Sequence, residues 1–269
     1  MIQRISSSKN SIIKETKSLK LRKNREELGL FFIEGLRMAE EAIKENAHIV
    51  RILMSDRFAE GVAADSILKW SDKVGCQTIV VPDKLFEEIS DTKTPQGILM
   101  VAETRFYEID EVLGNSNYLL VIDSIQDPGN LGTIIRTADA AGFTGVIVSK
   151  GCVDAYNPKV LRSTMGSIFR MPVCFTHSLE DALEKIRLKG ISIYASHLDA
   201  KVSCYEIDMT NNIAIIIGNE ANGVGSEILP YADRLIKIPM YGRTESLNAS
   251  IAAGILIYEC VRQRIANDL

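Results

Sequence analysis

From Tyr118 onward, short apolar runs are interleaved with segments of helical periodicity. The apolar runs are YLLVID, GVIVS, SIYAS, NIAIIIGNE and RLIKIPM, and the helical segments are GNLGTIIRTADAAG, SLEDALEKIRLKG and a final stretch from about Leu247 to Ile265. Nearly continuous apolar strands are typical of a parallel sheet with helices on both faces. We therefore predict an α/β domain with a mostly parallel sheet over residues 118–269.

A smaller α/β domain is predicted over residues 1–107, where a basic segment precedes four apolar runs. These runs are LGLFFIE, HIVRILMSD, CQTIVVPD and GILMVAE, with helices expected after Gly35 and around residues 63–74. Residues 108–117 are polar and contain a Gly-Asn-Ser-Asn cluster, which is typical of a linker. The chain therefore divides into two α/β domains.

Composition excludes several classes of protein. A chain of 269 residues with 46% hydrophobic content can bury a core in each of two domains. No run approaches eighteen apolar residues and the N-terminus lacks signal-peptide features, so we expect a cytoplasmic protein. The five cysteines and three histidines are scattered and form no CxxC pair. Disulfides, a metal site and a histidine-based catalytic triad are therefore not expected.

The formal net charge of -4 hides a basic N-terminal segment. Within residues 1–25, Glu15 is the one acidic residue, whereas lysines and arginines recur throughout. Such a segment either contacts the phosphates of a nucleic acid or forms the solvated face of an amphipathic helix. The candidate RNA-binding residues are Lys17, Lys20, Arg22, Lys23 and Arg25.

Three strand-to-loop junctions of the second domain are rich in glycine and polar residues. They are DSIQDPGNLGTIIRTADAAG, IIIGNEANGVGSEI and IPMYGRTESLNASIAAG. In parallel sheets, ligands bind beyond the carboxyl ends of the strands, which is where these junctions lie. Neither a dinucleotide-binding G-x-G-x-x-G nor a Walker A sequence is present. Glu220 lies between glycines at a strand end, and Arg136 is the first partner that we expect for its charge.

Taken together, these junctions resemble the three motifs of the SpoU (TrmH-like) family of RNA ribose 2'-O-methyltransferases, part of the SPOUT superfamily. The resemblance covers about residues 118–269 in order and spacing, and RSTMGSIFRMPV also resembles a family segment. The N-terminal FFIEGLRMAEEAI and TPQGILMVAE resemble the smaller substrate-binding domain of two-domain rRNA methyltransferases.

The resemblance implies a C-terminal trefoil-knot domain, S-adenosylmethionine as cofactor without a metal, an RNA substrate and a homodimer. It also implies roles for individual residues. The positions that match cofactor contacts are Gly218, Ile238 and Leu247, with Ser196, His197 and Met240 as further lining. The positions that match the catalytic set are Asn130, Arg136, Glu220, Ser246 and Asn248.

The expected reaction is methylation of a ribose 2'-hydroxyl in structured RNA, foremost large-subunit (23S) ribosomal RNA. Because a guanidinium is a very weak proton acceptor, we expect Arg136 to bind an RNA phosphate and stabilise developing negative charge, with a role as base as the minor alternative. Asn130 and Glu220 are expected to hold Arg136 in place. The same reaction on tRNA, or a non-catalytic role in RNA binding or ribosome assembly, remain the alternatives.

Overall fold

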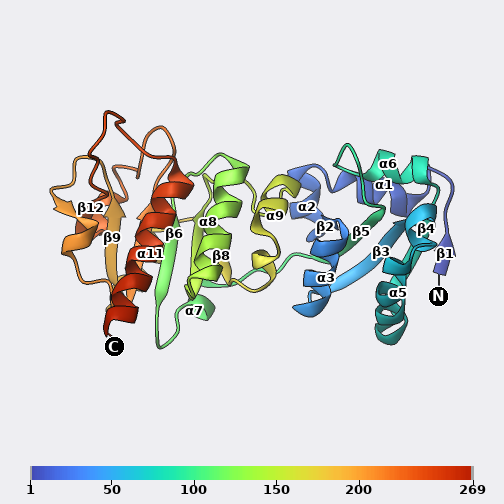
Figure 1. Ribbon diagram of the computed structural model, residues 1–269, viewed down its shortest axis with the longest axis horizontal. Helices are drawn as coiled ribbons and strands as arrows, with labels where there is room; N and C mark the ends of the chain where they lie inside the picture. Colours follow the sequence, from blue (N-terminus) through green and yellow to red (C-terminus); the bar gives the residue numbers. More distant parts are fainter. Residues whose placement is uncertain (1, 268–269) are drawn as a thin grey trace. The chain divides into compact units, whose positions relative to one another are not determined.

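The computed structural model describes residues 2–267, which form two compact units (Figure 1). Unit 1 consists of the chain up to Arg105 together with Tyr156–Phe169, and unit 2 consists of Phe106–Ala155 and Arg170 onward. The elements of unit 1 are β1 (Ile2–Arg4), α1 (Ser11–Ser18), α2 (Arg22–Leu28), β2 (Leu30–Glu34), α3 (Leu36–Lys44), β3 (Ile49–Ser55), α4 (Asp56–Ala59), α5 (Val62–Val74), β4 (Gln77–Val81), α6 (Asp83–Ile89), β5 (Ile98–Glu103), α9 (Pro158–Thr164) and η1 (Ser167–Phe169).

The sheet of unit 1 has the order β1-β4-β3-β5-β2. Strands β1, β4 and β3 are parallel, whereas β5 runs antiparallel to both β3 and β2. Side chains of β2 alternate between two faces of the sheet. Phe32 packs into the cluster that contains Ile13, Leu19 and Phe86. The apolar run LGLFFIE therefore provides a strand of a sheet that is covered on one face by α1 and α6.

The other face of β2 explains why residues 156–169 belong to unit 1. The Phe31 ring lies 4.6 Å from the Tyr156 ring and 6.5 Å from the Phe169 ring, measured between centroids. Phe31, Val160 and Leu161 are all buried. A segment inside the second sequence half thus completes the core of the first unit, which our two-domain division by sequence did not include.

Unit 2 is built on a second sheet, and its elements begin with α7. They are α7 (Ile109–Val112), β6 (Tyr118–Ile122), α8 (Pro128–Ala140), β7 (Gly145–Ser149), β8 (Val173–Thr176), α10 (Leu179–Leu188), β9 (Ser192–Ser196), β10 (Val202–Ser203), η2 (Cys204–Glu206), β11 (Ile213–Ile217), η3 (Leu229–Tyr231), β12 (Arg234–Lys237) and α11 (Ala249–Asn267). Residues 108–117, predicted as a linker, include α7, and its Ile109 and Val112 are buried in the core of this unit.

The second sheet has the order β10-β12-β9-β11-β6-β7-β8, and every strand pair in it is parallel. All five residues of β11 are buried, as expected for a central strand covered on both faces. Strand β12 lies between β9 and β10 and pairs with both, although both precede it in the chain. This return between earlier strands agrees with the trefoil knot implied by the family resemblance. Helix α11 then packs beside α8 (Figure 1).

Candidate active site

Four neighbouring strands of unit 2 end at one edge of the sheet. Because β12, β9, β11 and β6 are adjacent and parallel, the residues that follow them are brought together. A cavity of about 740 Å³ opens beside the loops after β9, β11 and β12. Its volume falls within the range of small-molecule and cofactor sites.

All six predicted cofactor-contacting residues line this cavity. Ser196 and His197 lie at the end of β9, Gly218 follows β11, and Ile238 and Met240 follow β12. Leu247, two residues before the start of α11, completes the set. The lining includes backbone as well as apolar side chains, which is the mixture that an adenine ring and an amino-acid group require.

Gly218 lies where two backbone segments approach each other closely. A Cβ atom at this position would lie 2.1 Å from the carbonyl carbon of Gly223 and from the nitrogen of Val224. Asn219 and Gly223 exchange backbone hydrogen bonds of 2.9 and 3.0 Å, so the loop 219–223 closes on itself. Gly223 adopts a φ of 70°, which favours glycine. These two glycines therefore shape one wall of the cavity from backbone alone.

Glu220 lies within that loop and binds the start of α8. Its carboxylate accepts hydrogen bonds from the side chain of Asn130 at 2.9 Å and from the backbone N–H groups of Gln126 and Asp127 at 3.2 and 3.1 Å. Burial acts to raise the pKa of Glu220, but these hydrogen bonds together with one from its own backbone outweigh it and lower the pKa below the usual value. Glu220 is therefore a carboxylate at neutral pH.

Asn130 connects Glu220 to Asn248, the residue that precedes α11. While its amide nitrogen donates to Glu220, its amide oxygen accepts from the side chain of Asn248 at 3.0 Å. The Asn248 oxygen in turn accepts from the backbone N–H groups of Ser250 and Ile251. A continuous chain of hydrogen bonds thus runs from Glu220 through Asn130 and Asn248 to the first turn of α11.

The structure departs from prediction at Arg136. Its side chain is exposed, and among residues 2–267 it forms neither a hydrogen bond nor an ion pair. Six residues advance an α-helix by about 600°, so Arg136 emerges about 120° around α8 from Asn130. The expected pair between Arg136 and Glu220 is therefore wrong, and Asn130 takes the place of Arg136. Ser246 is also exposed and lines the cavity.

Residues that the sequence analysis did not single out hold the loops at this edge. Asp123 is buried directly after β6, accepting from the backbone N–H of Gly225 at 2.8 Å and from the hydroxyl of Ser124. The side chain of Asn219 donates to the carbonyl of Ser124 at 2.7 Å. Asp123 and Asn219 each stand at the end of an apolar run, and that position was the available signal.

The predicted RNA-binding residues have different surroundings. Lys17 pairs with Glu88, and Lys20 donates to the carbonyl of Ser90. Arg25 is only 4% exposed and donates to the carbonyl of Leu19 at 2.7 Å, so its prediction as an RNA contact is wrong. Its burial stabilises the turn between α1 and α2. Arg22 and Lys23 are exposed, and Arg22 pairs with Glu26 one turn away.

Two further classes of site have no support in the part of the chain described. No cluster of three His, Cys, Asp or Glu side chains suited to a metal ion occurs among residues 2–267. None of the helices in that range combines the length and hydropathy that a bilayer crossing requires.

Comparison with known proteins agrees with this geometry. Residues 117–258 match the profile of the SpoU rRNA Methylase family, and residues 10–100 match the MRM3-like substrate binding domain. The chain belongs to the SpoU rRNA methylase family. The resemblance seen in the sequence is therefore confirmed, and with it an RNA 2'-O-methyltransferase that uses S-adenosylmethionine.

Relatives of this family match along nearly the whole chain. The chain is 35% identical over 257 residues to the 23S rRNA (guanosine(2553)-2'-O)-methyltransferase RlmP of Bacillus subtilis, covering 96% of this chain and 98% of that protein. An AdoMet-bound rRNA methyltransferase from Sinorhizobium meliloti superposes with a TM-score of 0.88 at 30% identity, covering 97% and 98% of the two chains. The AdoMet complex of AviRb from Streptomyces viridochromogenes also gives a TM-score of 0.88, at 28% identity and 96% and 99% coverage.

Proposed function

We propose that the protein methylates a ribose 2'-hydroxyl of large-subunit (23S) ribosomal RNA. The observation that carries the proposal is the junction of a cofactor-sized cavity with the hydrogen-bonded chain Glu220–Asn130–Asn248 at one edge of the sheet. The RlmP and AviRb matches extend over both units, which favours an RNA substrate of the kind that RlmP's name states.

The cavity suits S-adenosylmethionine. Gly218 lets the loop 219–223 fold back closely, so that backbone lines this side of the cavity, while Ile238 and Leu247 provide apolar walls for a purine. When bound, this cofactor supplies a methyl group on a positively charged sulfur. Ser196, His197 and Met240 complete the lining in our proposal.

Arg136 is the group proposed to act on the RNA. A ribose hydroxyl is a poor nucleophile until its proton is lost or shared, and negative charge grows on its oxygen as it reacts. The unpaired guanidinium of Arg136 has free donors for an RNA phosphate and for that charge. Its role as the proton acceptor stays the minor alternative, because a guanidinium gives up its proton only at very high pH.

Asn130, Glu220 and Asn248 are proposed as positioning residues. Their shared hydrogen bonds fix the first turn of α8 against the first turn of α11, and α8 carries Arg136. Displacement of a reacting group by about 1 Å lowers a rate about a hundredfold, so such bracing affects catalysis directly. Ser246, which is exposed and lines the cavity, is proposed to hydrogen-bond the target ribose.

Within the basic segment, Arg22 and Lys23 keep the role of RNA contacts in this proposal. Both are exposed on α2, whereas Lys17 and Lys20 are engaged within unit 1. Phosphate contacts of this kind add affinity that falls with salt and carries no sequence information.

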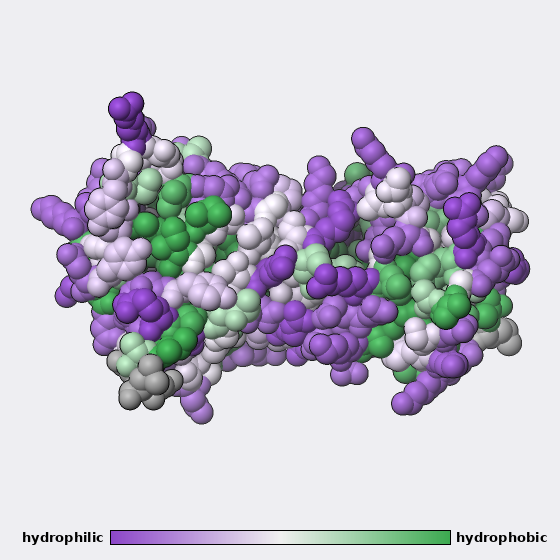
Figure 2. Space-filling view, viewed as in Figure 1, coloured by the Kyte–Doolittle hydropathy of each residue, from purple (hydrophilic) through white to green (hydrophobic). Residues whose placement is uncertain are grey.

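A second copy of this chain is the proposed partner of α11. Ile251, Tyr258 and Ile265 recur every seven residues on this helix and are 55%, 51% and 57% exposed. Figure 2 shows hydrophobic surface over α11. A self-complementary apolar stripe of this kind suits a two-fold symmetric dimer. Tyr258→Glu should give a monomer by light scattering, whereas Leu188→Glu, on the exposed face of α10, should not.

The reaction is tested with purified protein, 23S rRNA that lacks the modification, and a radiolabelled methyl donor. The wild-type chain should label the RNA, and Arg136→Ala should label it at least about a hundredfold more slowly. Arg234→Ala is the matched control, because this exposed arginine begins β12 at the opposite edge of the sheet. Failure of the wild-type chain to label 23S rRNA, or full activity of Arg136→Ala, would refute the proposal.

A further inference from the structure

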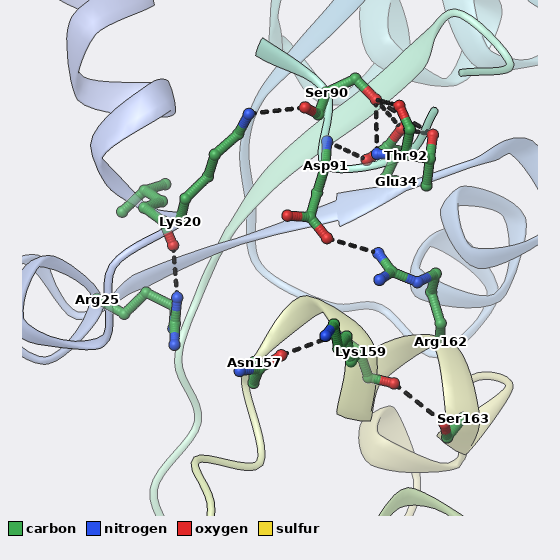
Figure 3. Close-up of polar contacts among 11 residues, drawn as sticks. Lys20, Arg25, Glu34, Ser90, Asp91, Thr92, Asn157, Lys159, Arg162 and Ser163 are labelled. Atoms are coloured by element: carbon green, nitrogen blue, oxygen red, sulfur yellow. Dashed lines mark hydrogen bonds and ion pairs between the residues drawn. The ribbon is translucent and has the colours of Figure 1, made fainter. Parts of the chain in front are cut away.

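The loop between α6 and β5, residues 90–97, is tied to unit 1 at both ends. At its start, the Glu34 carboxylate accepts hydrogen bonds from the Ser90 hydroxyl, from the Thr92 hydroxyl at 2.5 Å and from the Asp91 N–H at 2.9 Å (Figure 3). Lys20 donates to the Ser90 carbonyl at 2.6 Å. One charged group from β2 and one from the turn after α1 thus hold the beginning of the loop.

The end of the same loop is fixed by different contacts. The Gln96 side-chain oxygen accepts from the backbone N–H of Leu36 at 2.8 Å, at the start of α3. Gly97 has a φ of 90°, and a Cβ atom there would lie 2.6 Å from the Ser55 hydroxyl. Residues 91–96 therefore follow a fixed course although their side chains, apart from Thr92 and Pro95, are exposed.

Helix α9 lies against this loop and adds to the same surface. The guanidinium of Arg162 pairs with the Asp91 carboxylate at 3.0 Å (Figure 3). Asn157 caps α9 by accepting from the N–H of Lys159, and the hydroxyl of Ser163, one turn further, donates to the Lys159 carbonyl. Lys159 is exposed and Ser163 is half-buried; being four residues apart, they share one face of the helix.

On the loop 90–97 and on α9 the charge that remains is positive, whereas α3 carries Glu40 and Glu41 as well as Arg37. The acidic groups of the loop and of β2 are engaged, Asp91 by Arg162 and Glu34 by the loop itself. Three exposed cations stay without an ion pair or side-chain hydrogen bond among residues 2–267. They are Arg37 at the start of α3, Lys93 in the loop and Lys159 in α9. Residues 155–169 contain no Asp or Glu to offset them.

We propose that Arg37, Lys93 and Lys159, with the polar side chains of Thr94, Gln96 and Ser163, form a second surface of unit 1 that binds the phosphate backbone of the substrate RNA. We call these six residues the loop–α9 surface. Lysine, arginine, hydroxyl and amide groups are the usual donors to phosphates. Protein interfaces are instead enriched in aromatic residues and depleted in lysine, and no large exposed hydrophobic side chain belongs to these residues.

Because hydrogen bonds fix the loop at both ends, this part of the surface is already ordered before RNA binds. A loop already held in one course loses little conformational freedom when it binds, so more of the contact energy appears as affinity. Glu34 is then a positioning residue, since it acts on the RNA only through the loop. The inference rests on the proposed function, because it assigns part of the surface that the RNA substrate contacts.

The test compares the full-length wild type with Lys93→Ala/Lys159→Ala, using protein-free 23S rRNA as the probe at several KCl concentrations. Removal of each lysine that binds a phosphate should reduce the slope of log affinity against log salt by about 0.7 to 0.9. Lys69→Ala/Lys73→Ala, two exposed lysines on α5 of the same unit, is the charge-matched control and should keep the wild-type slope. Affinity for S-adenosylmethionine, measured by calorimetry, should be equal in all three proteins.

A variant of the positioning residue Glu34 separates the effect of loop order on RNA binding from the effect of charge. Glu34→Gln should weaken RNA binding yet keep the wild-type salt slope, because no cation is removed. An unchanged slope in the Lys93/Lys159 variant, or an equal fall in the α5 control, would overturn the inference. Wild-type protein that does not methylate the RNA at all would instead refute the proposed function, so the two failures are distinguishable.

Discussion

The side chain of Asn248 donates a 3.0 Å hydrogen bond to the side chain of Asn130, 118 residues earlier in the chain. Asn248 also accepts from the first N–H groups of α11. The same residue therefore caps one helix and braces the first turn of another, and these two tasks can be separated by mutation.

Asn248→Ala should remove both tasks, whereas Asn248→Asp should keep the cap and lose the donor to Asn130. Loss of a helix cap lowers the free energy of unfolding by about 1 kcal/mol. We expect that loss for Asn248→Ala in urea denaturation and near wild-type stability for Asn248→Asp. Both variants should transfer methyl groups more slowly, and normal activity of a stably folded Asn248→Asp would show that the link to Asn130 is dispensable.

Gly218→Ala should weaken binding of S-adenosylmethionine by about tenfold or more, which corresponds to about 1.4 kcal/mol. The added methyl group would meet the backbone of Gly223 and Val224 at 2.1 Å, so the loop beside the cavity must move. Gly242→Ala is the control, because a Cβ atom there meets nothing within 4 Å. Calorimetry gives both affinities; equal affinities would contradict the assigned cavity wall.

Arg25→Ala and Lys23→Ala should have opposite consequences although the residues are two apart. Arg25 is buried, and its loss leaves the carbonyl of Leu19 without that donor, which costs about 1 to 3 kcal/mol of stability. Lys23 is exposed, so its loss should leave the melting temperature unchanged and reduce the salt dependence of RNA binding. A fully stable Arg25→Ala protein would contradict the structural role of this arginine.

The stabilising contribution of Glu220 should disappear in acid. Because its folded-state pKa lies below the ordinary value of 4.5, the contribution is complete above that value and is lost as the pH falls through the lower, folded-state pKa. The difference in melting temperature between wild type and Glu220→Gln should therefore be constant from pH 7 to about pH 5 and shrink below it. A difference that grows on acidification would contradict the hydrogen bonding described.

The cysteines should be unreactive in the folded protein. All five are buried, and burial foremost raises the pKa of Cys174 to about 11 and that of Cys260 to about 12. Since the thiolate is the reactive form, iodoacetamide at pH 8 should label the denatured chain at five positions and the native chain at none. Mass spectrometry counts the labels, and rapid labelling of native protein would show that the core opens.

The sequence was sufficient where local pattern decides structure. The strands of unit 2 follow from apolar runs such as Ile213–Ile217, and their polar C-terminal junctions predicted a ligand site at one edge of the sheet. The family resemblance then identified Gly218, Ile238 and Leu247, which line the cavity at that edge. The sequence was less able to predict in which direction a side chain points around a helix. Arg136 was expected at Glu220, but the amide of Asn130 reaches the carboxylate first.

Burial of a charged residue was also hidden from the sequence. Arg25 looks like its neighbours Arg22 and Lys23 in a basic run, and only the folded turn places its guanidinium on the carbonyl of Leu19. Likewise, nothing in the residues near Tyr156 reveals that this ring packs on Phe31, because that contact spans 125 positions of the chain.

That last contact has a consequence for the order in which the protein is made. A chain synthesised from its N-terminus exposes Phe31 until Phe169 has left the ribosome, by which time β6, α8 and β7 of unit 2 have already been made. The two units must therefore mature in an interleaved order, not one after the other. For the same reason, the N-terminal domain cannot be transplanted between relatives as a cassette ending at Arg105; the donor must also contribute Tyr156–Phe169.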